Sequence, residues 1–257
     1  MDNASLELPP ERRAAAEPLF DRFADLPAIL GAVFDGGLGT VAVDDPVEPR
    51  VARLLIGCYA AFAGDAALGL ATDLVRSVPP PRELVYGGDP AWRRLCRAVH
   101  GDALEDHPNA TFDASTLDAA ALRAASQRLP PEYAMVQLDA RLAEQLDGNL
   151  EPHALQVFPS AAAFAKVGFG FGAQRDGRLA CVATSYAIGR GSAEVAIATR
   201  QADRGRGLAS AVAARFLLHS LEAGLVPEWN ASNPVSQRLA LRLGYRRRGS
   251  LEDMLLL

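Results

Sequence analysis

Residues 203–209 read Asp-Arg-Gly-Arg-Gly-Leu-Ala, and this loop decides the fold that we expect for the C-terminal part of the chain. It lies between a predicted strand, 194–199, and a stretch of helical periodicity at about 206–222. Its two glycines permit backbone conformations closed to other residues, and its two arginines add charge and planar donors. Because the start of a helix presents unpaired N–H groups, the loop is predicted to bind a phosphate group.

The segments on both sides of this loop predict a mixed sheet. Two turns, Asp176-Gly177 and 189–192, separate three strands that we expect to be consecutive and antiparallel. After the helix, residues 225–231 are predicted to form a strand, and Asn233-Pro234 to begin a second helix. A strand, a helix and a further strand in this order require a crossover connection, so the sheet is not purely antiparallel.

The composition is that of an ordinary globular protein. The chain has 257 residues, of which 49% are hydrophobic and 22% charged, and it holds three scattered cysteines and four scattered histidines. No apolar run approaches the roughly 18 residues that a membrane span needs. The first residues lack the basic flank and apolar segment of a secretory signal, so we expect a cytoplasmic location with reduced thiols. Because the histidines and cysteines are scattered, we expect no metal site.

The charge is distributed unevenly along the chain. Residues 200–248 hold nine arginines against three acidic residues, a net charge of +6, although the whole chain carries −5. This pattern favours a small anionic ligand over a nucleic acid, which needs a broader positive surface. The alternative is a compositional bias, because Lys166 is the sole lysine and arginine is the default cation.

Residues 1–130 predict an accessory α/β region that precedes a second domain, 131–257. No group of residues in this region forms a recognisable chemical site. The run 51–63 is apolar throughout, so its periodicity does not distinguish a strand from a helix. The other predicted helices and strands are, in order, 10–23, 40–43, 65–78, 83–86, 91–99, 116–129 and 133–138.

Residues from about 160 to 257 resemble the GNAT acyltransferase superfamily. Its signature [RQ]xxGx[GA], between a central strand and its helix, is matched by the stretch Arg204 to Ala209. Its second signature, Asn-x-x-[Ala/Ser] followed by Leu-Gly-[Phe/Tyr], is matched by Asn233, Ser236 and the stretch 243–245. The resemblance implies an α+β fold with a mixed, mostly antiparallel sheet flanked by helices. The extra N-terminal region is similar to that of a bacterial GNAT subfamily.

The resemblance also implies a binding site for acetyl-CoA as cosubstrate. The pantetheine arm would pair with the backbone of Ile197, Ala198 and Thr199 in the manner of an added strand. Asn233 and Ser236 would contact the lower arm; the alternative is that Asn233 only caps its helix. The pyrophosphate would be held by Arg204, Gly205, Arg206, Gly207, Leu208 and Ala209.

The candidate catalytic residues are Glu194, at the strand position where the family often has its base, and Tyr186. Glu194 is the candidate base, although the sequence also allows a solvated glutamate at a strand end. The common phenol donor lies seven residues after the asparagine, where this chain has Ala240. Tyr186 is a substitute donor; water, or departure of the thiolate without a donor, are the alternatives. Trp229 is either a core residue or a wall of the substrate cleft.

Together these observations predict an acetyl-CoA-dependent N-acetyltransferase that acts by direct attack in a ternary complex. The expected partner is a small-molecule or peptide amine, with neither a membrane nor a nucleic acid involved. The sequence leaves open whether the protein is a monomer or a homodimer. A different reading, prompted by Ala240, is a sensor that binds acyl-CoA with little turnover. A second is an interaction protein in which the N-terminal half recognises a macromolecule.

Overall fold

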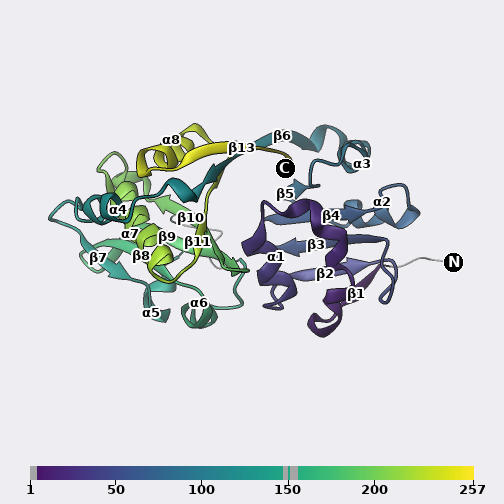
Figure 1. Cartoon of the computed structure of the whole chain (residues 1–257), viewed down its shortest axis with the longest axis horizontal. Coiled ribbons are helices and arrows are strands. Elements are labelled where there is room, and N and C mark those ends of the chain that lie inside the picture. The colour runs from purple at the N-terminus through teal and green to yellow at the C-terminus, as the bar shows by residue number, and fades with distance from the viewer. Residues whose placement is uncertain (1–4, 147–149, 151–155) are drawn as a thin grey trace. The chain divides into compact units, whose positions relative to one another are not determined.

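The computed structural model describes residues 5–146, 150 and 156–257, which form two compact units. The N-terminal unit comprises Met1–Asn109 together with Ser250–Leu257, and the C-terminal unit comprises Ala110–Gly249. Strands β6 (Leu104–Asp113) and β13 (Arg246–Leu256) each begin in one unit and end in the other (Figure 1). These units are defined by contacts, and the expected division at residue 130 stays a prediction.

The C-terminal unit contains a five-stranded sheet with the order β11-β10-β9-β8-β7. Its strands pair antiparallel, except for the parallel pair β10 and β11. The three consecutive antiparallel strands and the crossover predicted from the sequence are therefore confirmed. The elements, in chain order, are η4 (Ala114–Thr116), α4 (Ala119–Ser126), β7 (Ala134–Gln137), α5 (Ala140–Ala143), α6 (Ala161–Val167), β8 (Gly170–Arg175), β9 (Arg178–Gly189), β10 (Ser192–Thr199), η5 (Gln201–Asp203), α7 (Leu208–Glu222), β11 (Val226–Glu228), β12 (Asn230–Ala231) and α8 (Pro234–Leu243).

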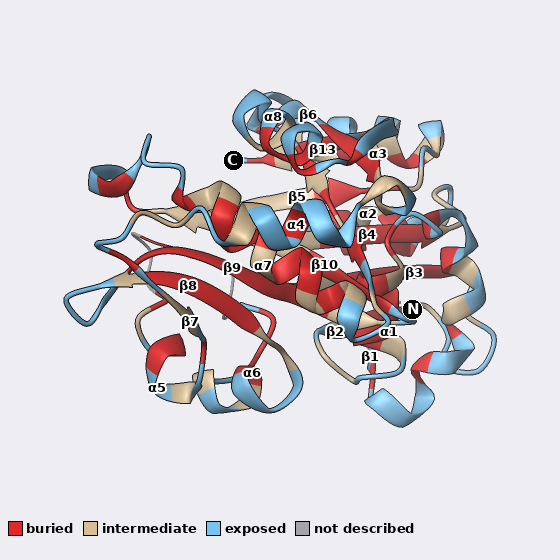
Figure 2. Cartoon of the chain, turned by 60° about the vertical axis from the view of Figure 1, so that its left-hand side comes forward, coloured by how far each residue is buried: buried red, intermediate tan, exposed pale blue. Residues whose placement is uncertain are grey.

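Turn residues and one apolar helix face fix this sheet. Asp176 and Gly177 between β8 and β9 both have positive φ, as a tight hairpin turn requires, and so do Arg190 and Gly191 between β9 and β10. Helix α7 buries most of its length, and its residues join Phe171 and strand residues of β9 in one core cluster. Figure 2 shows this buried interior along β8, β9 and β10.

The N-terminal unit is built around strands in the order β1-β2-β3-β4-β5-β13. All of these pair antiparallel except β4 and β5, which are parallel. Its elements are β1 (Leu6–Leu8), η1 (Pro10–Ala15), η2 (Glu17–Phe23), α1 (Pro27–Phe34), β2 (Thr40–Val43), β3 (Val51–Ile56), β4 (Tyr59–Gly64), α2 (Gly69–Arg76), β5 (Arg82–Val85), α3 (Pro90–His100), η3 (Gly101–Ala103) and the start of β6.

The structure resolves the ambiguous run 51–63 and corrects two expectations. The run is a hairpin, β3 and β4, which turns at Gly57 with positive φ. The helix expected at 10–23 is a pair of 3₁₀ segments, η1 and η2. Strand β6 was not expected, because charged residues and Pro108 remove any regular apolar pattern from it. Within the described ranges, no helix combines the length and hydropathy of a membrane crossing.

Buried carboxyl groups lie in the N-terminal unit near the pairing of β5 with β13. Asp253 is buried, and the Asn109 amide donates to its Oδ2 at 3.2 Å and also to Glu83. Burial raises the pKa of Asp253 to about 6, from the usual value of 3.8. The folded protein therefore holds a proton on this carboxyl more tightly than the unfolded chain does.

Stability is expected to fall as pH rises through about 6, because a raised pKa in the folded state stabilises only while the group is protonated. The loss between about pH 4 and pH 8 is on the order of 2 kcal/mol. Asp253→Asn is expected to remove this part of the pH dependence, measured by urea unfolding at pH 5 and pH 8. Asp21→Asn, at an exposed position, is the control. An unchanged pH dependence in Asp253→Asn would contradict the assignment.

Candidate functional site

The candidate site lies where strand β10 separates from β11. The parallel register covers Ser192–Glu194 against Val226–Glu228, and no later pair of these two strands follows in the described structure. Strand β10 nevertheless continues to Thr199, paired on its other edge with β9. The half-buried residues Ile197, Ala198 and Thr199 thus offer one backbone edge to a partner of extended shape.

Both predicted catalytic residues lie at one irregularity of the sheet. Glu194 is opposite Ala187 and Val195 is opposite Ser185, so Tyr186 is the additional residue of a β-bulge. The Glu194 and Tyr186 side chains are each 4% exposed. The bulge therefore brings together two residues that are eight positions apart in the sequence.

Glu228 is a candidate residue that the sequence reasoning missed. It is the direct register partner of Glu194 across the parallel pair. Register partners in neighbouring strands point to the same face of a sheet, about 5 Å apart, so two carboxylates are neighbours here. Two such groups side by side favour a bound cation or a shared proton. The register of a crossover pair is not visible in the sequence, which is why this signal was missed.

The loop after β10 has the backbone of an anion cradle. Gly205 and Gly207 have φ of 77° and 80°, in the left-handed region that favours glycine. Among the described residues, none accepts a hydrogen bond from the amides of Gly205 to Ala209. Arg204 Nε donates to the Thr199 carbonyl at 3.2 Å, which ties the loop to the end of β10. These amides at the N-terminus of α7 are suited to a phosphate.

A polar cluster of the buried Asp203 and Tyr133 and the exposed Arg175 anchors the start of this loop. Asp203 Oδ1 accepts a hydrogen bond from the Tyr133 hydroxyl at 2.7 Å and lies 3.6 Å from Arg175 Nη2. Arg175 also donates to the Tyr133 hydroxyl at 3.1 Å and stacks over its ring. The hydrogen bond to Asp203 raises the pKa of Tyr133. Neither partner of Asp203 was identified from the sequence, because both contacts are long-range.

The second signature forms the start of α8. The Asn233 side chain accepts a hydrogen bond from the Ser236 amide at 2.9 Å, so it is an N-cap as expected. The Ser236 hydroxyl accepts from the Trp229 indole at 3.0 Å, leaving its own hydrogen for a further acceptor. Trp229 is buried and packs on Tyr245 in the core cluster, and Ala240 is fully buried.

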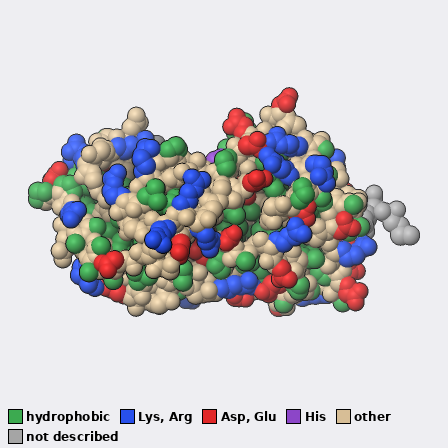
Figure 3. Space-filling model, turned by 45° about the horizontal axis from the view of Figure 1, so that its top comes forward, with side chains coloured by type: hydrophobic (Ala, Val, Ile, Leu, Met, Phe, Trp, Pro, Cys, Tyr) green, Lys and Arg blue, Asp and Glu red, His purple; other side chains and the backbone are tan. Residues whose placement is uncertain are grey.

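Most of the arginines clustered in residues 200–248 are exposed, and the described residues hold no group of side chains that could bind a metal. Arg200, one of the clustered arginines, is buried, while those of the loop, of α8 and of residues 246–248 are exposed. Figure 3 shows basic side chains distributed among apolar and acidic ones on the visible face, without one continuous basic surface. Among the described residues, no group of His, Cys, Asp and Glu side chains is arranged as a metal site.

A comparison with protein families decides the assignment of the fold. A sequence profile of the GNAT acetyltransferase family matches residues 17–252. The chain belongs to the GNAT acetyltransferase family. It is therefore an acyltransferase, and the family profile covers both units of the structure.

Relatives of this GNAT protein are similar along almost the entire chain. The uncharacterized N-acetyltransferase YdfB of Bacillus subtilis (strain 168) is 25% identical over 254 residues, covering 93% of this chain and 94% of YdfB. A GCN5-related N-acetyltransferase-like protein from Streptococcus suis has a crystal structure with a TM-score of 0.85 and 26% identity, covering 96% of this chain and 99% of the other. A tandem GNAT protein from the clavulanic acid biosynthesis pathway shares the fold, with a TM-score of 0.62, 13% identity, and coverage of 98% and 97%.

Replacing Tyr133 tests the anchor of the loop. Tyr133→Phe is expected to lower the free energy of unfolding by about 1–3 kcal/mol, because the buried Asp203 carboxylate loses a hydrogen-bond donor. The measurement is urea unfolding at neutral pH. Glu132→Gln, at the adjacent exposed position, is the control and is expected to change stability by less than about 0.5 kcal/mol. Equal effects of the two variants would argue against the anchor.

Proposed function

We propose that this GNAT protein transfers an acetyl group from acetyl-CoA to an amine by direct attack in a ternary complex. The observation that carries the proposal is the continuity of the β10 edge with the loop amides. In the described structure β11 does not pair with Ile197–Thr199, and the chain passes from this edge through η5 (Gln201–Asp203) to the amides of Gly205 to Ala209. An extended chain that ends in a pyrophosphate matches both features, and CoA thioesters have this form.

The residues that would hold acetyl-CoA fit its chemistry. Ile197, Ala198 and Thr199 provide backbone groups for the amides of the pantetheine arm. The loop supplies amide donors and two guanidinium groups for the pyrophosphate, and a Cβ at Gly205 or Gly207 would meet nothing within 4 Å. Ser236 has a hydroxyl hydrogen to donate to the lower arm, and Asn233 holds the helix start in place.

The acyl transfer needs a proton acceptor at the amine and a leaving thiolate. The amine nitrogen attacks the thioester carbonyl, and the bond from that carbon to sulfur breaks to release CoA thiolate. In the proposal Glu194 accepts the ammonium proton, directly or through water. In the proposal Tyr186, at the same bulge, supplies the proton for the thiolate; water is the alternative donor, since Ala240 has no proton to give.

The paired carboxylates favour an acceptor that arrives as a cation. Glu194 and Glu228 leave the same face of the sheet as register partners, so an ammonium group between them would be attracted to both. This argument selects positively charged amines over neutral acceptors within the broad class of small-molecule or peptide amines.

Arg206→Ala is expected to weaken acetyl-CoA binding by about tenfold, the usual loss for one charge-assisted hydrogen bond. Isothermal titration calorimetry with acetyl-CoA measures the change. Arg178→Ala, at the exposed start of β9, is the matched control and is expected to bind like the wild type. If the wild-type protein gives no heat of binding with acetyl-CoA, both the proposed acetyltransferase and the alternative acyl-CoA sensor are refuted.

Glu194→Gln is expected to lower kcat by about 10²–10⁴-fold while the Kd for acetyl-CoA stays unchanged, because the amide cannot take a proton. Thiol release from acetyl-CoA, measured across a panel of cationic amines, reports the rate. Glu228→Gln in the same assay distinguishes the two carboxylates. A larger loss of kcat in Glu228→Gln than in Glu194→Gln would assign the base to Glu228 on β11. A wild type that binds acetyl-CoA without thiol release on any amine would favour the sensor.

A further inference from the structure

The two units repeat one order of elements. The N-terminal unit runs from β1 through a helical segment to three antiparallel strands, β2 to β4, then α2, β5, α3 and β6. The C-terminal unit runs from β7 through α5 and α6 to β8, β9 and β10, then α7, β11, the two-residue β12, α8 and β13. In both, the fourth of these strands pairs in parallel with the fifth over three register positions. The parallel strands then separate after Ala61 in one unit and after Glu194 in the other.

Residues at corresponding positions are also alike. Helix α2 begins at Gly69-Leu70-Ala71-Thr72, and α7 begins after its N-cap in Gly207-Leu208-Ala209-Ser210. Helix α3 begins at Pro90 after Asp89, and α8 begins at Pro234 after Asn233; both polar side chains are N-caps. In each unit the two matches lie on either side of the fifth strand, β5 or β11, so they occur in the same order along the chain.

We infer that the chain is an internal duplication in which Trp92 fills the slot of the N-terminal repeat that corresponds to the coenzyme site, so that one coenzyme binds per chain. This inference rests on the proposed function for the location of the coenzyme site in the C-terminal repeat. The correspondence places Trp92 where the C-terminal repeat has Ser236, three residues after the helix cap.

Trp92 packs against β4 just beyond the point at which β4 separates from β5. Its side chain is 1% exposed and stacks on Phe62 with 5.3 Å between ring centroids. Its indole nitrogen donates to the Gly64 carbonyl at 3.0 Å. Phe62 and Gly64 lie on β4 beyond its last register pair with β5, at Ala61. Counted from the last pair in each unit, Gly64 corresponds to Ile197 on β10. The Gly64 carbonyl, the backbone group that a pantetheine amide would use in this repeat, is therefore already bonded to Trp92.

The anion cradle is absent from the corresponding loop. Counting from the shared Gly-Leu-Ala, Arg204 corresponds to Ala66 and Gly205 to Ala67. The Asp65 carboxylate accepts a hydrogen bond from the Ala67 amide at 2.9 Å, so an anionic side chain lies where a phosphate would need a donor. Ala61 stands at the position of Glu194, which leaves this repeat without the proposed base.

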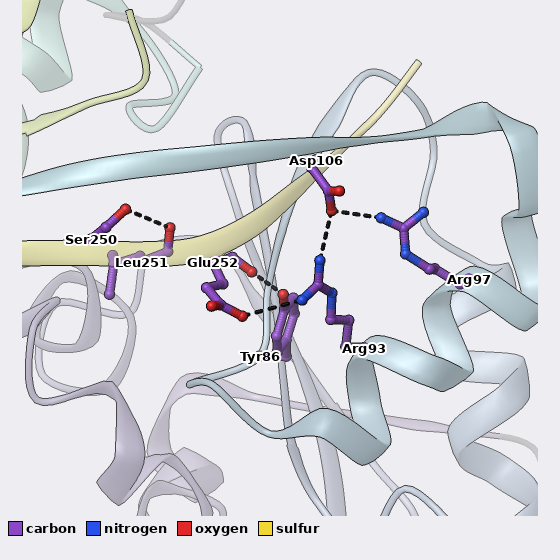
Figure 4. Close-up of polar contacts among 7 residues, drawn as sticks. All are labelled: Tyr86, Arg93, Arg97, Asp106, Ser250, Leu251 and Glu252. Carbon is purple, nitrogen blue, oxygen red and sulfur yellow. Dashed lines mark hydrogen bonds and ion pairs between the residues drawn. The ribbon is translucent and has the colours of Figure 1, made fainter.

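The N-terminal repeat has a structural role instead. Its last strand, β6, ends in the C-terminal unit, where Ala110 and Thr111 pair with β12 just before α8. The last strand of the other repeat, β13, ends in the N-terminal unit, where Met254 to Leu256 pair with β5. Figure 4 shows how the N-terminal unit holds this strand: Tyr86 donates to the Glu252 carbonyl, and Arg93 pairs with the Glu252 side chain at 3.2 Å. Each repeat thus gives its final strand to the other.

Two glycine variants of the full chain, at corresponding positions, test the inference by calorimetry with acetyl-CoA; Gly207 has a positive φ and Gly69 does not, so the fold of each variant is checked separately. Gly207→Glu places a carboxylate in the proposed cradle, and Gly69→Glu places one at the corresponding position of the N-terminal repeat. A Cβ at Gly69 would meet nothing within 4 Å, so this variant is expected to fold. We expect one site per chain in the wild type, the same stoichiometry and an affinity within about twofold in Gly69→Glu, and loss of binding in Gly207→Glu. Circular dichroism confirms that both variants are folded.

Each other outcome has a defined meaning. Two sites per chain, or a site that Gly69→Glu removes, would overturn the inference about Trp92. A wild type that does not bind acetyl-CoA would overturn the proposed function and, with it, the expectation of one coenzyme per chain. Binding that survives in Gly207→Glu but disappears in Gly69→Glu would reverse the roles of the two repeats and overturn both.

Discussion

The candidate site depends on the point at which two parallel strands stop pairing. Three register positions hold β10 against β11, and the pairing ends at Glu194. A continued ladder would satisfy the backbone of Ile197 to Thr199 and leave no edge for a ligand. Because the strands separate, the edge of β10 stays available up to Thr199, whose carbonyl is bonded to Arg204 in the loop before α7. The bulge at Tyr186 falls at the same level and places the candidate acid beside the candidate base.

An open loop at this position needs support, which the surrounding residues provide. Within the part of the chain that the structure describes, no group accepts a hydrogen bond from the amides of Gly205 to Ala209, so the loop gains little from its own hydrogen bonds. Asp203 at its start is fixed by Tyr133 and Arg175, and Arg204 bonds back to Thr199. A loop that is anchored at its base and free at its amides is organised before a ligand arrives, which reduces the entropy lost on binding.

The sequence predicts the local features well and the long-range ones poorly. The two hairpin turns, helix α7 and the cap at Asn233 follow from glycine, asparagine and the apolar period, which act within a few residues. Glu228 beside Glu194, and Tyr133 beneath Asp203, depend on registers and contacts that only the folded chain defines. The duplication does leave a trace in the sequence, the two Gly-Leu-Ala stretches. It is obscured because α2 has 8 residues and α7 has 15, so no fixed period relates the repeats.

The exchange of final strands has a consequence for the order in which the protein is made. Strand β5 pairs with β4 on one edge and with β13 on the other. Strand β4 is made before β5, but the β13 residues Met254 to Leu256 are made last. At about 5–20 residues per second, the ribosome needs on the order of ten seconds to supply that segment. During this time the nascent N-terminal unit carries an uncovered strand edge, a surface to which other chains readily add. The sheet of the N-terminal unit is therefore completed late, whereas the five-stranded sheet of the C-terminal unit needs no residue beyond Glu228.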